Sequence, residues 1–282
     1  MKKILIILII LSLTLSGCVS MTEVDEDKVE DLTDKITKTI IDSVGKEDAK
    51  RQESHQVEAT NLTKLDIESS VGNIFITTHD SSEVTVDLNI TAKSKSKEKA
   101  QQLVDNFNYS INEKWDTLKI VTTQEDSNIL DNDNIQTELS VNIPKNIKSF
   151  VISLNVGDID IKNTDGNFEI NNNVGNIEIY SSAGSFNLKS DVGEVILDNC
   201  TPLNKTELKA NTGDIKVIFT DITEAKTITA ETGVGDIELA TPDNSNYEAE
   251  IDEFMKDKIV VNKGSMDTKI KLKTGVGDIN FK

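Results

Sequence analysis

The sequence is poor in the residues on which most sugar-binding and catalytic sites depend. Aromatic residues make up 4% of the 282 residues, and tryptophan and arginine occur once each, at Trp115 and Arg51. A sugar cleft needs aromatic platforms and convergent carboxylates or basic groups. Of the two histidines, His79 lies in the turn-like segment THDSSE, and no nucleophile motif accompanies it. The composition therefore argues against an enzyme.

Cysteine is nearly absent, with only Cys18 and Cys200 present. Cys18 lies at the end of the N-terminal signal described below and is expected to carry lipid. Cys200 then has no partner, which excludes a disulfide framework, so the fold must depend on a hydrophobic core. Cys200, which precedes Thr201 and Pro202, is better interpreted as a small buried apolar residue than as a nucleophile.

Positive charge is also scarce, because 30 Lys and Arg face 49 Asp and Glu, for a formal charge of −19. Such a chain repels phosphate, which argues against a nucleic-acid partner. It would attract cations or basic peptides, although acidic side chains also simply keep an exposed protein soluble.

The N-terminus reads as a lipoprotein signal over residues 1–17. Lys2 and Lys3 precede the apolar run of residues 4–11, which is too short to stay in a membrane as a spanning helix. The segment LSGC resembles a lipobox, which implies cleavage before Cys18 and attachment of lipid to its thiol. We therefore expect an extracytoplasmic protein of the cell envelope, anchored to the membrane through Cys18. The alternative is an ordinary signal peptide in which Cys18 is incidental.

Residues 18–56 read as a charged tether. Apolar residues spaced by three or four predict an amphipathic helix over about 25–44, which Gly45 ends. The polar segment KEDAKRQESHQ that follows predicts a linker.

A glycine repeat dominates residues 151–282. The segments VGDIDI, VGNIEI, VGEVIL, TGDIKV and VGDIEL recur at intervals of 18 to 22 residues, and a second class of strand alternates with them. Such coils must stack to bury their apolar faces, which predicts an all-β, parallel β-solenoid with an antiparallel β-sandwich as the alternative. The glycines that we expect at the corners are Gly157, Gly175, Gly193, Gly213, Gly235 and Gly277.

The register of the stack can be predicted from the repeat. Within the glycine-containing class, two columns should face inward: Ile159, Ile177, Val195, Ile215 and Ile237, and beside them Ile161, Ile179, Leu197, Val217 and Leu239. In the second class, one column should contain Phe168, Phe186, Leu208 and Ile228. We also expect the valine before each glycine to point inward. In the closing segment, Lys269, Lys271 and Lys273 should protect an exposed strand edge.

Residues 57–150 are less regular and are predicted to cap one end of the stack. The alternating residues 84–90 predict a strand, and residues 96–107 predict a helix. Residues 118–121 and 139–143 predict further strands, the last of which Pro144 ends.

The segments SKSKEKAQQLVDNF and ELSVNIPKNIKSFVISLNVGDIDI, followed by the VGDIxI strands, carry a family resemblance. From about Leu62 to Lys282 the chain resembles a β-strand-repeat family of bacterial and archaeal envelope proteins that are described as candidate adhesins and whose function is unknown. The resemblance implies a solenoid-like β fold and an envelope setting. It supplies no catalytic residues.

One chemical hypothesis arises from the residue after each glycine. In a stack, Asp158, Glu194, Asp214 and Asp236 would form a row of acids along one edge, and a hard cation such as calcium would relieve their repulsion. The interpretation as turn residues is stronger, because the ligand pattern of calcium-binding nonapeptide repeats is missing.

We therefore predict a non-enzymatic, lipid-anchored envelope protein without a cofactor. Its repeated surface would bind an envelope, peptide or glycan partner, or support the envelope under stress. The alternative from another class is a polysaccharide lyase or hydrolase, because stacked β-coils also carry such activities.

Overall fold

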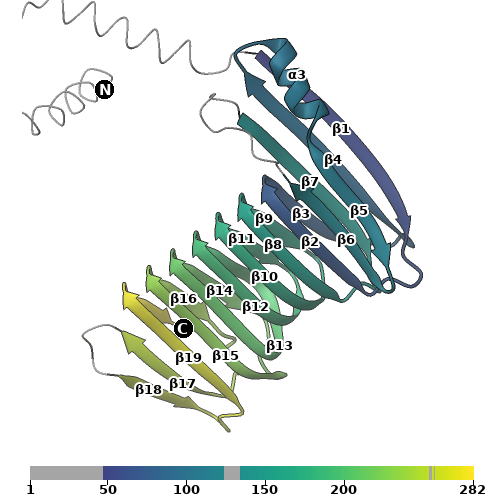
Figure 1. Ribbon diagram of the computed structural model, residues 1–282. Helices are drawn as coiled ribbons and strands as arrows, with labels where there is room; N and C mark the ends of the chain where they lie inside the picture. Colours follow the sequence, from purple (N-terminus) through teal and green to yellow (C-terminus); the bar gives the residue numbers. More distant parts are fainter. Residues whose placement is uncertain (1–46, 124–133, 254–255, 257) are drawn as a thin grey trace, which may run out of the picture. The chain divides into compact units, whose positions relative to one another are not determined.

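The computed structural model describes residues 47–123, 134–253, 256 and 258–282 (Figure 1). These residues belong to one compact unit that begins at Gly45. The predicted signal peptide, Cys18 and the helix expected at 25–44 lie outside the described residues. Among the residues described, no helix has the length and apolar character needed to cross a membrane.

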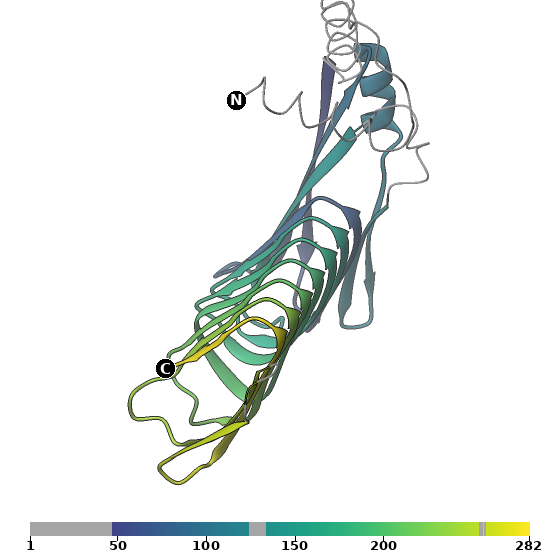
Figure 2. The ribbon, with the colours of Figure 1, turned by 90° about the vertical axis from the view of Figure 1, so that its left-hand side faces the viewer.

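The strands form two sheets that face each other along the stack, and Figure 2 shows the coils edge on. In hydrogen-bonded order, sheet A contains β1 (Glu47–Glu58), β4 (Glu83–Ser94), β7 (Asn134–Pro144), β3 (Asn73–His79), β9 (Ile159–Lys162), β11 (Ile177–Tyr180), the first part of β13 (Val195–Thr212), β14 (Ile215–Phe219), β16 (Ile237–Ala240) and β20 (Ile279–Phe281).

Sheet B contains, in the same sense, β5 (Asn108–Lys114), β6 (Thr117–Thr123), β2 (Lys64–Val71), β8 (Ser149–Val156), β10 (Gly166–Val174), β12 (Ala183–Val192), the second part of β13, β15 (Ala225–Val234), β19 (Thr268–Val276), β17 (Tyr247–Glu253) and β18 (Ile259–Lys263). The pairing is parallel from β7 to β20 in sheet A and from β6 to β17 in sheet B. The fold is therefore an all-β solenoid, and the parallel pairing excludes the antiparallel sandwich.

Both inward columns predicted for the glycine-containing strands are present. Ile159, Ile177, Val195, Ile215 and Ile237 pair in register, and their neighbours Ile161, Ile179, Leu197, Val217 and Leu239 do the same. All ten side chains are buried. Alternation with period two places every second side chain of these short strands between the sheets, which gives the solenoid its core.

The register predicted for the second strand class is wrong at Leu208, whereas Ile228 of the following coil lies in the predicted column. Phe186 pairs with Thr206 rather than Leu208, and Leu208 pairs with Leu188. Two extra residues of this coil form an irregularity before Thr206, and a buried threonine fills the position where an apolar residue was expected. Its hydroxyl has no hydrogen-bond partner. The apolar pattern alone therefore placed Leu208 in the column of Phe186, two residues beyond Thr206, which occupies it.

Phenylalanine occupies this column in the preceding coils. The rings of Phe150, Phe168 and Phe186 stack with centroid distances of 4.8 and 5.3 Å and nearly parallel planes. The spacing equals the distance between adjacent strands, so register pairing itself determines the stacking.

The N-terminal region contributes a coil to the stack, contrary to the boundary expected at residue 150. β2 and β3 contain the corner Val71-Gly72-Asn73 and pair in parallel with β8 and β9. This coil lies between the coil of β6 and β7 and that of β8 and β9, although residues 83–144 separate them in sequence.

The linker expected before residue 57 is also corrected, because residues 47–58 form β1, which pairs antiparallel with β4. Backbone hydrogen bonding makes a strand of a polar segment here, and helix α3 (Lys97–Asp105) packs against both strands. Arg51 of β1 donates from Nη1 to the carbonyl oxygens of Val104 and Phe107 at 3.0 and 3.2 Å, which satisfies the end of the helix. Ser96 caps the start of this helix, because its Oγ accepts the backbone N–H of Lys99.

At the C-terminal end, the lysines predicted to protect an edge lie elsewhere. Lys269, Lys271 and Lys273 belong to β19, which pairs with β15 on one side and β17 on the other. The hairpin of β17 and β18 therefore forms the edge of sheet B, because the chain between β16 and β19 adds two strands outside β19.

Candidate binding surface

The corner that joins sheet B to sheet A is built on glycine in each coil. Gly72, Gly157, Gly175, Gly193, Gly213, Gly235 and Gly277 have φ angles between +111° and +150°. A Cβ atom on Gly175 would lie 1.9 Å from the carbonyl oxygen of Gly157, and the glycines from Gly157 to Gly277 all face the glycine of the neighbouring coil in this way. Positive φ and close backbone approach both exclude other residues, so the predicted corner role is confirmed.

The valine before each glycine points outward, which corrects the inward placement expected from the sequence. Val156, Val174, Val192, Val234 and Val276 are between 45% and 58% exposed. Register pairing places them in one row together with the half-buried Val71 and with Thr212. We call this row of seven residues the valine ridge. At ~4.8 Å per strand it is about 29 Å long.

Polar side chains fill the inside of the same corner. Asn172, Ser190, Thr232 and Thr274 occupy one buried column of sheet B. Each donates to the carbonyl oxygen of the glycine one coil earlier, as Asn172 Nδ2 does to Gly157 at 2.8 Å and Thr232 Oγ1 to Gly213 at 2.8 Å. In these four coils the corner has a polar interior and an apolar or threonine exterior, because the turning backbone leaves carbonyl groups that need donors inside. Leu154 and Ala210 occupy the same column in two other coils.

The predicted row of acids lies beside the ridge, where its side chains bond the backbone. Oδ1 of Asp158 accepts the N–H of Asn176 at 2.8 Å, and Oδ1 of Asp214 accepts that of Asp236 at 2.9 Å. Asn73, Asn176 and Asp236 make the same bond to the next coil. Each side-chain oxygen therefore holds the following corner in register.

Glu194 departs from this pattern. Its carboxylate binds Lys216 Nζ at 2.8 Å, and Asp214 lies 3.7 Å from the same ammonium. The residues described contain no group of three or more His, Cys, Asp or Glu placed to hold a metal ion. N–H donors and Lys216 reduce the repulsion within the row, so the geometry gives these acids a structural role.

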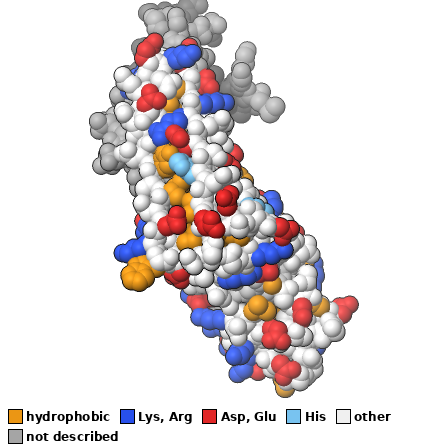
Figure 3. Space-filling view, turned by 90° about the vertical axis from the view of Figure 1, so that its right-hand side faces the viewer, with side chains coloured by type: hydrophobic (Ala, Val, Ile, Leu, Met, Phe, Trp, Pro, Cys, Tyr) orange, Lys and Arg blue, Asp and Glu red, His pale blue; other side chains and the backbone are white. Residues whose placement is uncertain are grey.

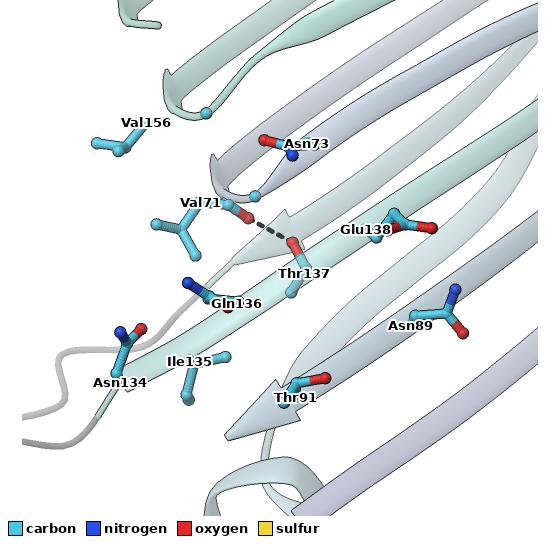
Figure 4. Close-up of a pocket in the computed structure, with 12 residues that line it drawn as sticks. Val71, Asn73, Asn89, Thr91, Asn134, Ile135, Gln136, Thr137, Glu138 and Val156 are labelled. Carbon is cyan, nitrogen blue, oxygen red and sulfur yellow. Dashed lines mark hydrogen bonds between the residues drawn. The ribbon is translucent and has the colours of Figure 1, made fainter. Parts of the chain in front are cut away.

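A shallow groove of about 420 Å³ opens at the N-terminal end of the ridge (Figure 4). Val71 and Val156 point the same way at two successive corners, and amide and hydroxyl side chains of β4 and β7 lie below them. The lining residues with polar side chains are Asn73, Asn89, Thr91, Asn134, Gln136, Thr137 and Glu138. Thr137 Oγ1 donates to the carbonyl oxygen of Val71, which ties β7 to the first glycine corner. The groove combines an apolar wall with groups that both donate and accept hydrogen bonds.

Away from the row of acids beside the ridge, the described surface carries charges of both signs. On the face in Figure 3, acidic and basic side chains are interspersed. On sheet B, Glu207 lies between Lys205 and Lys209 at 2.7 and 2.6 Å, and these hydrogen bonds lower the pKa of Glu207 to about 2. Such exposed pairs contribute little stability each.

Three titratable side chains outside the corner, Cys200, His79 and His55, lie within hydrogen-bonding distance of other protein groups. Burial raises the pKa of the Cys200 thiol to about 11, and its Sγ donates to the carbonyl oxygen of Ile179. A thiol that stays protonated is a poor nucleophile. His79, which was expected in a turn, is the last residue of β3, and its Nε2 lies 2.9 Å from the carbonyl oxygen of Glu83. His55 Nε2 lies 3.0 Å from Tyr109 Oη.

Sequence reasoning missed the valine ridge, although a signal for it exists. Two residues before the corner residue, the inward position is polar in five of the seven coils, at Ser69, Asn172, Ser190, Thr232 and Thr274, and apolar in the other two, at Leu154 and Ala210. Where the inward residue is polar and the corner residue two positions later is apolar, the pattern indicates that the corner side chain points outward rather than inward.

Residues 165–282 match the family model Toastrack DUF4097. Among solved structures, a candidate adhesin of Bacteroides fragilis is 19% identical, with a TM-score of 0.46 over 83% of this chain and 98% of that one. A candidate cell adhesion protein of Clostridium sporogenes is 15% identical, with a TM-score of 0.38 over 83% and 99%. A candidate lipid-binding protein of Parabacteroides distasonis is 17% identical, with a TM-score of 0.34 over 82% and 97%.

No curated protein matches the chain. Likeness at the level of these solved structures does not transfer a function. The family match covers the coils from β10 to β20, which include five of the seven glycine corners. The similarity to the Toastrack DUF4097 family is therefore confined to residues 165–282 of this chain.

Proposed function

We propose that the protein is a non-enzymatic, extracytoplasmic binding protein of the cell envelope, anchored through lipid on Cys18, which binds an elongated glycan or peptide along the valine ridge. The observation that carries the proposal is the ridge itself. Seven successive corners present the same outward position in register, and six of them contain valine. A long row of weak identical contacts binds through avidity rather than through one pocket.

The surroundings of the ridge support this use. Exposed valine costs solubility, and a row of them is more than the scattered apolar residues normal for a surface. Hydrogen-bonding side chains lie in the groove at its N-terminal end, and amides such as Asn155 and Asn173 lie beside it. A partner with repeated apolar faces and polar edges would fit both features.

Binding along the ridge can be tested by replacing valine with threonine, a residue that the row already contains. Thr212 shows that threonine is accommodated in the row, so Val156→Thr, Val174→Thr and Val192→Thr in one chain should fold normally. We expect this triple variant to bind isolated envelopes of the producing cells at least about tenfold more weakly, since each valine contributes a fraction of a kilocalorie per mole to a shared interface.

The matched control is Ile218→Thr, because Ile218 is 51% exposed on the outer face of sheet A, away from the ridge. Equal binding by the triple variant and the wild type would refute the ridge as the binding surface. Turnover of a purified polysaccharide that depends on one exposed acid would refute the non-enzymatic assignment.

The anchor has a separate test. We expect Cys18→Ser to move the protein from the membrane fraction to the soluble fraction, because one acyl-bearing cysteine is the proposed attachment point. Unchanged membrane association in that variant would contradict the lipid anchor and leave the ridge experiment unaffected.

A further inference from the structure

The C-terminal end of sheet B extends beyond the stack of coils. Sheet A ends at β20, the coil partner of β19, whereas sheet B continues through β17 to β18. Among the strands described, the register pairings join β18 to β17 alone, so one side of its backbone has no strand partner. Unpaired N–H and C=O groups along an edge are a template for another strand.

β18 differs from the edge strands at the other end of the unit. Those strands, β1 and β5, have the sequences EDAKRQESHQVE and NYSINEK, in which charged and polar residues protect the edge. β18 has the sequence IVVNK, and Ile259 and Val260 are 51% and 57% exposed. Ile259 and Val260 point to opposite faces of the sheet, so the strand is apolar on both sides.

The charge at this end permits a second copy of the chain to approach. The protein carries a formal charge of −19, which opposes self-association in general. β17, however, carries four acids, and β18 and β19 together carry four lysines and no acid. Three of the acids lie opposite lysines in register, as Glu250 does opposite Lys271.

The lysines next to the edge are also engaged. Lys258 Nζ binds Glu250 at 2.6 Å, and Lys263 Nζ lies 5.7 Å from the centre of the Tyr247 ring. This end is therefore locally neutral, and the charges that usually guard an edge strand are held within the hairpin.

We propose that two copies of the protein associate through β18, which pairs antiparallel with β18 of the second copy. The pairing continues the antiparallel β17–β18 hairpin, satisfies the free backbone groups and covers Ile259 and Val260 with β18 of the partner. A two-fold axis makes such an edge self-complementary. The result is a pair of solenoids joined end to end, which doubles the number of ridges on one particle.

Single cysteines introduced into the full chain in cells test this proposal directly. A two-fold antiparallel pair places one residue opposite itself at a Cα distance of about 4.5–5.5 Å, within the range of a disulfide. We expect one of Ile259→Cys, Val260→Cys, Val261→Cys and Asn262→Cys to give a dimer of twice the chain mass on mild oxidation. The wild type and the matched control Ile218→Cys should stay monomeric, because Cys200 is buried.

A second substitution checks that the cross-link reports stable pairing rather than chance collision. Adding Val260→Lys, or Ile259→Lys where position 260 carries the cysteine, should lower the cross-linked fraction at least about fivefold, whereas adding Ile218→Lys should leave it unchanged. Absence of a dimer at all four positions, equal cross-linking at Ile218→Cys, or insensitivity to the added lysine would overturn the proposal. Since none of these residues lies on the ridge, envelope binding by the variants distinguishes this result from a failure of the proposed function.

Discussion

The two corners of each coil differ in how much length they tolerate. Through the glycine corner, the spacing never changes: Val156, Val174, Val192, Thr212, Val234 and Val276 each lie three residues before the inward residue of sheet A and six after that of sheet B. Through the opposite corner the spacing grows, from seven residues between Ile161 and Phe168 to nine between Leu197 and Thr206 and eleven between Val217 and Ile228.

The difference shows where the fold fixes its repeat. All variation in coil length, including the β17–β18 hairpin inserted between β16 and β19, enters at the opposite corner. Backbone hydrogen bonds between neighbouring coils continue through the glycine corner. The N–H of Gly175 donates to the carbonyl oxygen of Val192, and the N–H of Gly193 donates to that of Thr212. The ridge therefore stays in register whatever the length of the coil, which a binding surface made of repeated contacts requires.

The largest effect should come from adding one methyl group at the glycine corner. Gly175→Ala combines a φ of +129° with a Cβ placed 1.9 Å from the carbonyl oxygen of Gly157. We expect a loss of at least about 3 kcal/mol in the free energy of unfolding, measured by urea denaturation. Asn163→Gly at the opposite corner, where φ is already +53°, should change it by less than about 1 kcal/mol. Equal effects would remove the distinction between the corners.

Insertions should separate the corners next. Gly-Ser placed between the exposed residues Thr223 and Glu224 extends a corner that already varies in length, and we expect a cost of about 1 kcal/mol. The same dipeptide placed between Gly175 and Asn176 shifts the strand register of sheet A relative to that of sheet B. We expect this variant to lose its cooperative unfolding transition altogether. Circular dichroism melts of the two variants make the comparison, and tolerance of the second insertion would contradict it.

A smaller effect is expected from the row of acids beside the ridge. Asp214→Ala removes the acceptor for the Asp236 N–H and should cost about 1 kcal/mol, whereas Asp214→Asn should be nearly neutral, because Asn176 already makes the equivalent bond. Calcium at millimolar concentration should leave the melting temperature unchanged. A rise of several degrees that Asp214→Asn abolishes would instead favour the cation hypothesis.

The smallest effect concerns Glu207, which lies just after the irregular stretch of β13. Because its pKa falls from 4.5 to about 2 through Lys205 and Lys209, its ion pairs stabilise the fold fully above pH 4.5 and lose this contribution as pH falls towards 2. Glu207→Gln should cost less than about 1 kcal/mol at pH 7. The difference from wild type should shrink when the same urea titration is repeated at pH 3; a constant difference would assign the effect to packing.

The comparison of corners also explains which parts of the fold were predictable. Both inward columns of sheet A follow from the invariant spacing after glycine, so the sequence was sufficient for Ile159 and its equivalents. The register of the one coil after Phe186 was not predictable, because two residues enter at the variable corner and a buried threonine replaces an apolar residue at Thr206. Ile228 of the following coil returns to the predicted column. Backbone pairing, which the side-chain pattern does not record, made a strand of the polar β1. Val71 belongs to the segment VGNIFI, which has the pattern of the repeat, but the long segment between this corner and the next one concealed that the two coils are adjacent.

The ridge was hidden for a related reason. Period-two alternation along the strand predicts that each corner valine points into the core. The strand of sheet B ends at this valine, the chain turns at a glycine with positive φ, and the valine side chain is exposed. The polar residues that fill the corner in its stead, such as Asn172 and Ser190, are readable in the sequence once the reversal is known.

Thr212 provides the most direct measurement of the central claim, that the ridge binds the envelope partner. It is the one position in the row without valine, so Thr212→Val completes the ridge without disturbing its neighbours. Damage to the fold cannot imitate a gain in affinity. The account predicts that Thr212→Val binds isolated envelopes more tightly than wild type, by about twofold to fivefold in the dissociation constant, with unchanged stability. Unchanged or weaker binding by a normally folded Thr212→Val protein would contradict it.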